Sequence, residues 1–99
     1  MENSMNAVMA TNELYNNSLT QFMNIQIAIN EKKLTKQQAT AMIRNVANMM
    51  KVQYGTIEKA FNNKVAWQRY DEEYRPLFKE LVDQMQEYLQ TELNPTKSL

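Results

Sequence analysis

The sequence predicts an all-α protein, a small helical bundle of about four helices that forms a single helical domain over residues 1–99. Composition supports this, since one Gly and two Pro leave few sharp turns while strong helix formers are abundant. Apolar residues also recur at steps of three and four, which is helical periodicity. A chain of 99 residues is long enough for one hydrophobic core.

The first predicted element is one long amphipathic helix over residues 4–30, in which Tyr15, Leu19 and Phe22 follow steps of four and three. At 1.5 Å per residue it measures about 40 Å, which is long for a domain of this size, so we expect part of it to pack on a second chain. Its outer face has almost no charge and consists of Asn16, Asn17, Ser18, Thr20, Gln21 and Asn24. A homo-oligomer is therefore expected, with Tyr15, Leu19 and Phe22 as candidate partner-binding residues.

Residues 36–63 are expected to form two helices. Thr35 and Gln38 have the spacing of a capping box, which predicts a helix start there. The apolar face that follows consists of Ala39, Ile43, Val46 and Met50, and the single glycine, Gly55, is the expected break before a helix that carries Ile57 and Phe61.

The last predicted helix spans residues 76–93, with a tail at 94–99. Pro76 either opens a new helix or kinks a continuous one, and the start of a new helix is favoured. Just before it, Trp67 and Tyr70 suit either the core or an aromatic contact with a protein partner. Of the eight Met residues, Met9 and Met49 are those expected to lie off the core.

Several functions are disfavoured by composition. The chain has no Cys and no His, so thiolate metal sites, the commonest metal ligand and the commonest general base are all missing. Glu80, Asp83 and Glu87 share a helical face, but a solvated surface explains them better than a metal site. No apolar run approaches the roughly 20 residues that span a bilayer. We expect a cytoplasmic, non-enzymatic protein with no cofactor, no metal and no membrane association.

The net charge of zero hides an uneven distribution. Residues 31–64 carry seven Lys or Arg and two Glu, whereas residues 65–99 carry four basic and seven acidic side chains. A basic middle segment is typical of a nucleic-acid-binding face. It is equally typical of helices that attract one another.

Residues 46–63, VANMMKVQYGTIEKAFNN, resemble the helix-turn-helix of bacterial repressors of the lactose-repressor type. The agreeing positions are a small contact residue, an apolar plug in the turn, two inner residues of the recognition helix, two family-typical polar residues and a Lys where the family usually has Arg: Ala47, Val52, Ile57, Phe61, Thr56, Asn62 and Lys59. Such a motif places its second helix in a major groove of DNA.

The resemblance implies a set of DNA-contacting residues. Base edges would meet the first turn of the recognition helix, Gln53, Tyr54 and Gly55. Phosphates would meet the remaining polar and basic positions, Thr56, Lys59, Asn62, Lys64, Arg44 and Lys51. The expected function is therefore that of a small DNA-binding regulator of transcription, bacterial or phage, acting as a dimer on two half-sites.

Two positions depart from the motif and keep an alternative open. Lys51 stands where a Gly with positive φ is usual, and Gln53 stands where a better helix cap, Ser, is usual. In the alternative, residues 36–63 are two core helices joined at Gly55. The protein would then be a helical protein–protein interaction module, such as a phage or mobile-element inhibitor, a chaperone or a structural subunit.

Overall fold

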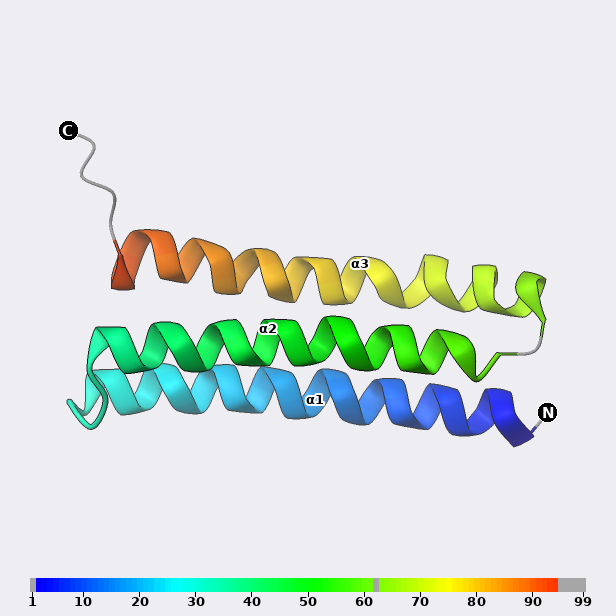
Figure 1. Ribbon diagram of the computed structural model, residues 1–99, viewed down its shortest axis with the longest axis horizontal. Helices are drawn as coiled ribbons and strands as arrows, with labels where there is room; N and C mark the ends of the chain where they lie inside the picture. Colours follow the sequence, from blue (N-terminus) through cyan, green and yellow to red (C-terminus); the bar gives the residue numbers. More distant parts are fainter. Residues whose placement is uncertain (1, 62, 95–99) are drawn as a thin grey trace.

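Three long helices lie side by side in the computed structural model of the protein, which describes residues 2–61 and 63–94 (Figure 1). They are α1 (Glu2–Asn30), α2 (Lys36–Lys59) and α3 (Lys64–Tyr88), and α3 runs on into a π-helical turn, η1 (Leu89–Leu93). The chain runs up, down and up again, with no strand in the described ranges. The all-α prediction is confirmed.

The prediction of about four helices is wrong, because Pro76 lies inside α3 and does not start a helix. A proline in a helix removes one backbone hydrogen bond, to the carbonyl four residues earlier. Here that residue is Glu72, and both it and Pro76 are exposed, so water can satisfy the freed carbonyl. The buried residues Tyr70 and Phe78 lie on either side of Pro76 at helical spacing, and burying both favours one continuous helix.

The expected helix-turn-helix is not formed in its predicted register. α2 continues without interruption through Lys51, Gln53 and Gly55 to Lys59, and Gly55 does not have a positive φ. Val52, the expected plug of the turn, is 68% exposed. The reason is that Met50 and Ile57 are both buried seven residues apart, a spacing that only an unbroken helix keeps on one face.

The turn lies after α2, where Asn63 caps α3 by accepting hydrogen bonds from the backbone N–H groups of Val65 (2.8 Å) and Ala66 (3.2 Å). Asn62, one of the predicted DNA contacts, lies outside the described residues. So do residues 95–99 of the predicted tail.

The turn between α1 and α2 is a Schellman motif followed by the predicted capping box. Lys32 adopts a positive φ of 61°, and the N–H groups of Lys32 and Lys33 donate to the carbonyls of Ile29 and Ala28. Thr35 and Gln38 then cap each other reciprocally at 3.0 Å, which confirms the predicted start of α2. Two lysines are thereby held at the end of the bundle where α1 finishes.

The core runs along the axis of the bundle and is drawn from all three helices. Its buried positions follow steps of three, four, seven and eight, and they are Ala7, Leu14, Phe22 and Ile25 on α1, Ala39, Ile43, Val46, Met50 and Ile57 on α2, and Tyr70, Phe78, Leu81 and Met85 on α3, with Leu93 on η1. Phe78 lies at the junction, with edge-on ring contacts to Tyr15 of α1 (5.5 Å) and Tyr54 of α2 (5.1 Å).

The length of α1 gives no reason by itself to expect a second chain. α2 and α3 have 24 and 25 residues beside the 29 of α1. The molecule is an elongated rod with extents of 50 × 28 × 16 Å, so α1 is accompanied by its own chain along most of its length (Figure 1).

Candidate protein-interaction surface

The residues predicted to contact DNA do not form one edge of the molecule. Arg44, Lys51, Lys59 and Lys64 are exposed, and so are Gln53 and Thr56. At 3.6 residues per turn, however, nine positions amount to about half a revolution, so Gln53 lies on the opposite side of α2 from Arg44. Thr56 is occupied locally, since its hydroxyl donates to the Val52 carbonyl at 3.1 Å. The continuous helix thus separates groups that the motif would have gathered.

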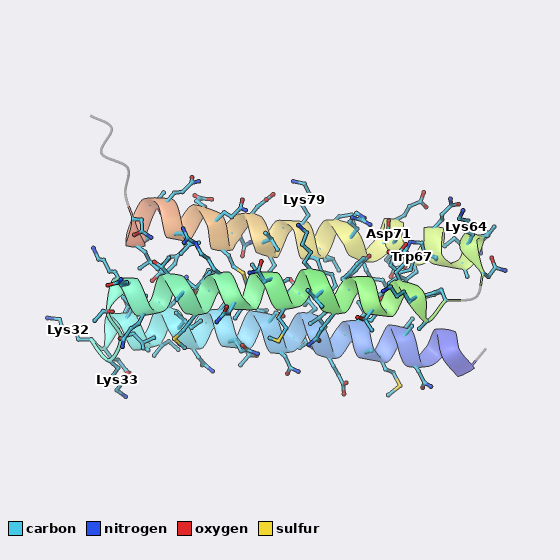
Figure 2. The ribbon with its side chains drawn as sticks, viewed as in Figure 1. Lys32, Lys33, Lys64, Trp67, Asp71 and Lys79 are labelled. Carbon is cyan, nitrogen blue, oxygen red and sulfur yellow. The ribbon has the colours of Figure 1, made fainter. Side chains whose placement is uncertain are left out.

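Tyr54, the predicted base-reading residue, belongs to the packing between α2 and α3. Its hydroxyl donates to a carboxylate oxygen of Asp71 at 2.8 Å, and its ring contacts those of Trp67 (5.5 Å) and Phe78 (5.1 Å). Arg75 binds the same carboxylate through Nε at 2.9 and 3.0 Å. Figure 2 shows Asp71 and Trp67 on the first half of α3. Burial, and then the bond to Asp71, raises the pKa of the Tyr54 hydroxyl, as expected of a structural tyrosine.

The predicted partner-binding residues are also largely internal. Phe22 and Tyr70 are buried, and the Phe22 ring packs edge-on against Tyr88 at 5.7 Å. Tyr15, Leu19 and Trp67 are partly buried and pack against the core. The structure thus uses these five side chains, at spacings of three and four, for contacts between helices within one chain, and their role as partner contacts stays a prediction.

A different surface is exposed and weakly polar, and it lies on the outer side of α1. Met9, Met23 and Ile27 are 59%, 50% and 50% exposed. Together with Asn16 and Thr20, which are also exposed, they follow steps of seven, four, three and four and therefore share one face. We call these five residues the outer stripe of α1. Among residues 6–30 the one charged side chain is Glu13, at the edge of this stripe.

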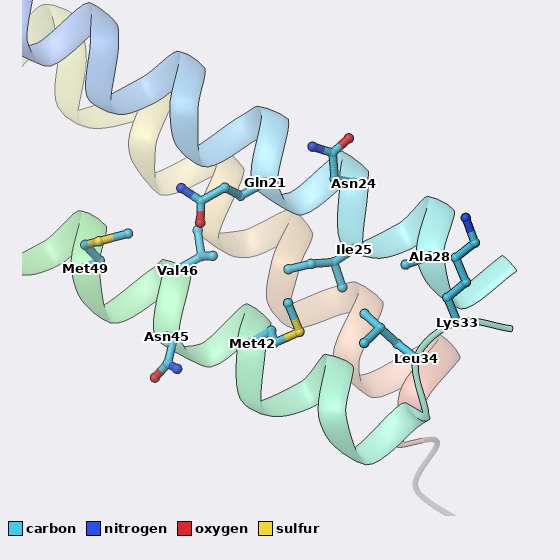
Figure 3. A pocket seen from close by; sticks show the side chains of 10 residues that line it. All are labelled: Gln21, Asn24, Ile25, Ala28, Lys33, Leu34, Met42, Asn45, Val46 and Met49. Atoms are coloured by element: carbon cyan, nitrogen blue, oxygen red, sulfur yellow. The ribbon is translucent and has the colours of Figure 1, made fainter. Parts of the chain in front are cut away.

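A groove lies beside that stripe, between α1 and α2, and its volume is about 740 Å³. Figure 3 shows Ile25, Leu34, Met42 and Val46 directed into the space between the two helices, while Asn24 and Asn45 point outward at its rims. Lys33 stands at the end nearest the turn and pairs with Glu31 at 3.0 Å. The α1–α2 groove is therefore apolar inside, amide-lined at its edges and basic at one end.

The sequence predicts only some of the exposed methionines at and near this groove. Met9 and Met49 were expected off the core, and both are exposed, but Met23 and Met42 are exposed as well. Their positions are out of step with the buried series, Phe22 and Ile25 on α1 and Ile43 and Val46 on α2. This offset is the signal that could have identified them, although it does not reveal that the two helices leave a hollow.

Other kinds of site find little support in the described parts of the chain. Residues 2–61 and 63–94 contain no group of three or more His, Cys, Asp or Glu side chains placed to hold a metal ion. None of the described helices combines the length and the apolar character needed to cross a bilayer.

Comparison of the chain with protein-family models, with curated proteins and with solved structures gives no match to any of the three.

Proposed function

We propose that this protein is a non-enzymatic protein-interaction module whose α1–α2 groove receives a helix from a partner protein. The observation that carries the proposal is the groove itself, about 740 Å³ and lined by apolar side chains that include Ile25, Val46 and Leu34. Amphipathic helices commonly bind in grooves of this kind through apolar residues at steps of three, four and seven. Methionine walls suit such contacts, since the thioether side chain adapts its shape.

The chemistry of the groove describes the partner helix. Asn24 and Asn45 at the rims, and Gln21, whose side chain extends towards Val46 (Figure 3), offer amide donors and acceptors and no charge, so the flanks of the partner should be polar and uncharged. Lys32 and Lys33 lie at the α1–α2 turn (Figure 2). Because the C-terminal end of a helix carries partial negative charge, the partner helix is expected to end there, parallel to α1.

A photo-crosslinking experiment tests this proposal. A photoreactive amino acid at Met49 should capture a partner, whereas the same group at Lys79, which points away from the bundle on α3, should not (Figure 2). In the chain that carries the probe, Met42→Asp should abolish capture by placing a charge in an apolar groove.

Leu77→Asp is the matched control, because Leu77 on α3 is 45% exposed and Met42 is 42% exposed. Circular dichroism should show both variants folded. The proposal would be contradicted if the probe at Met49 still captured a partner in the Met42→Asp variant. It would also be contradicted if Met42→Asp and Leu77→Asp abolished capture equally.

DNA binding is the second candidate, and the observation that favours it is the exposure of Arg44, Lys51 and Lys59 on α2. It would operate from the side of a continuous helix, mainly through phosphates. A gel shift at two salt concentrations separates the two functions. DNA would be favoured over a protein partner if the protein retained DNA at low salt, if Lys51→Glu abolished that retention, and if Met42→Asp left it unchanged.

A further inference from the structure

We infer that the outer stripe of α1 is a second interface, through which two copies of this chain pair with their α1 helices antiparallel. This goes beyond the proposed function, because the stripe is separate from the α1–α2 groove and its partner is the chain itself. The starting point is that α1 is buried on one face by Leu14, Phe22 and Ile25 and yet is not charged on the other. A surface helix normally places charged residues opposite its buried face.

The composition of the stripe fits a second copy of itself. The five residues of the stripe offer no charge to select an oppositely charged partner, and the single charge at its edge, Glu13, is the only one near enough to face its own image. The net charge of the chain is zero, so long-range repulsion between copies is also absent, and proteins near zero charge associate readily. Three large side chains, Met9, Met23 and Ile27, are at least half exposed and gain burial in such a pair.

The order of residues along the stripe favours the antiparallel direction. With the two-fold axis at the level of residue 18, Met9 lies opposite Ile27 of the second copy, and Asn16 lies opposite Thr20. Apolar residues then meet at both ends, an amide meets a hydroxyl at the centre, and Met23 comes level with Glu13 at the edge of the second copy's stripe. One interface patch thus pairs with itself, as a two-fold symmetric dimer requires.

Charge at the helix end supports the same direction. In a parallel pair Lys32 and Lys33, held at the end of α1 by the Schellman turn, would lie beside the same two lysines of the second copy. The antiparallel pair separates them by nearly the length of the helix and also sets the two helix dipoles in opposite directions. The stripe is one helix wide and about 27 Å long, so we expect a reversible dimer of modest interface area.

Sedimentation and crosslinking of the full chain test this inference. Sedimentation over a range of concentrations should show a species of twice 11.7 kDa. Ile27→Glu should weaken self-association by at least about tenfold, while Leu77→Glu on α3, where Leu77 is 45% exposed, should not. The native chain has no cysteine, so single Met9→Cys and Ile27→Cys variants have unique thiols for a short crosslinker.

A mixture of the two cysteine variants should form crosslinked dimers, whereas Met9→Cys alone should not, because its two thiols lie about 27 Å apart along the helix. Efficient crosslinking of Met9→Cys alone would show a parallel pair and overturn the inference, as would equal crosslinking in every combination. A monomer at all concentrations would also overturn it. Capture from Met49 reports on the groove separately, so failure of the dimer and failure of the proposed function are distinguishable.

Discussion

α1 and α3 both run the length of α2, but they are built from different residues on both faces. On its inner side α1 carries small buried residues, Ala7, Thr11 and Ser18, between its large ones, whereas the buried residues of α3 are all large. On the outer side the contrast is in charge. α3 has ten charged residues among its 25, while residues 6–30 of α1 have one.

The inner difference explains how the bundle is packed. α1 pairs more extensively with α2 than α3 does, as expected where small side chains let two helices approach closely. α3 is held against α2 by aromatic contacts instead, since the Tyr54 ring of α2 contacts the rings of Trp67 at 5.5 Å and Phe78 at 5.1 Å on α3. One side of α2 thus depends on close approach and the other on large side chains.

The outer difference concerns function. The charged face of α3 includes pairs such as Lys79 with Asp83 at 3.1 Å, which is the normal character of a surface in water. α1 instead presents amides, methionines and Ile27. The side of the bundle formed by α1 is therefore where partners are expected, and α3 supplies the matched controls.

The largest expected effect comes from removing the residue that joins all three helices. Phe78→Ala should lower the free energy of unfolding by about 3–5 kcal/mol, since it leaves a cavity between Tyr15 and Tyr54. Urea unfolding followed by circular dichroism measures this. A loss below about 1 kcal/mol would mean that α3 is not held by its rings.

Close approach on the α1 side is tested at Ser18, which was expected on the outer face but is 1% exposed. Ser18→Leu should destabilise the fold by about 1–3 kcal/mol through overpacking. Ser18→Ala should have the opposite sign, with a gain of about 0.5–1.5 kcal/mol, because the buried Oγ has no hydrogen-bond partner among the described residues. If Ser18→Leu were neutral, the small-residue packing of α1 would be disproved.

The polar link between α2 and α3 gives the smallest of the three effects. Tyr54→Phe removes the hydrogen bond to Asp71 and should cost about 1 kcal/mol. Arg75 still binds Asp71, which limits the loss. Thermal unfolding of the two proteins side by side measures it.

The same variant should alter the response to alkali. Burial and the Asp71 bond raise the pKa of Tyr54 in the folded protein above the unfolded value of about 10. The contribution of the neutral Tyr54 hydroxyl to the free energy of unfolding is therefore complete below about pH 10, and it is lost as the pH rises above that value. Between about pH 9 and about pH 11, the unfolding free energy of Tyr54→Phe should fall less steeply than that of the native chain. Burial also raises the pKa of Tyr70 and Tyr88, so part of the slope should remain, and equal slopes would remove Tyr54 from this role.

Helical class and the start of α2 could be predicted because both depend on local patterns. Apolar steps of three and four and the Thr35–Gln38 capping box act within one or two turns. The C-terminal end of α2 and the path through Pro76 could not be predicted in the same way. Gly55 and Pro76 are weak helix residues, and their helical state depends on burial of Met50, Ile57 and Phe78 against other helices.

Prediction of the candidate site was less successful, and particular residues show why. Tyr54 fits a recognition helix by spacing alone, but in the fold its hydroxyl is bound to Asp71, 17 positions away. By residue type and spacing, Phe22 and Tyr70 suit a contact with a partner as well as they suit the core, but both are buried within one chain. The type and spacing of side chains do not determine whether a helix face packs within its own chain or against a partner chain.

The amino-acid sequence by itself determined that this protein is helical, that α2 begins after a capping box, and that α1 is almost free of charge. Only the tertiary structure decided that residues 36–59 form one helix, that the aromatic residues face inward, and that α1 and α2 leave a groove. The physical reason is that helix formation and capping act over a few residues, whereas burial depends on the contact of segments far apart in the chain.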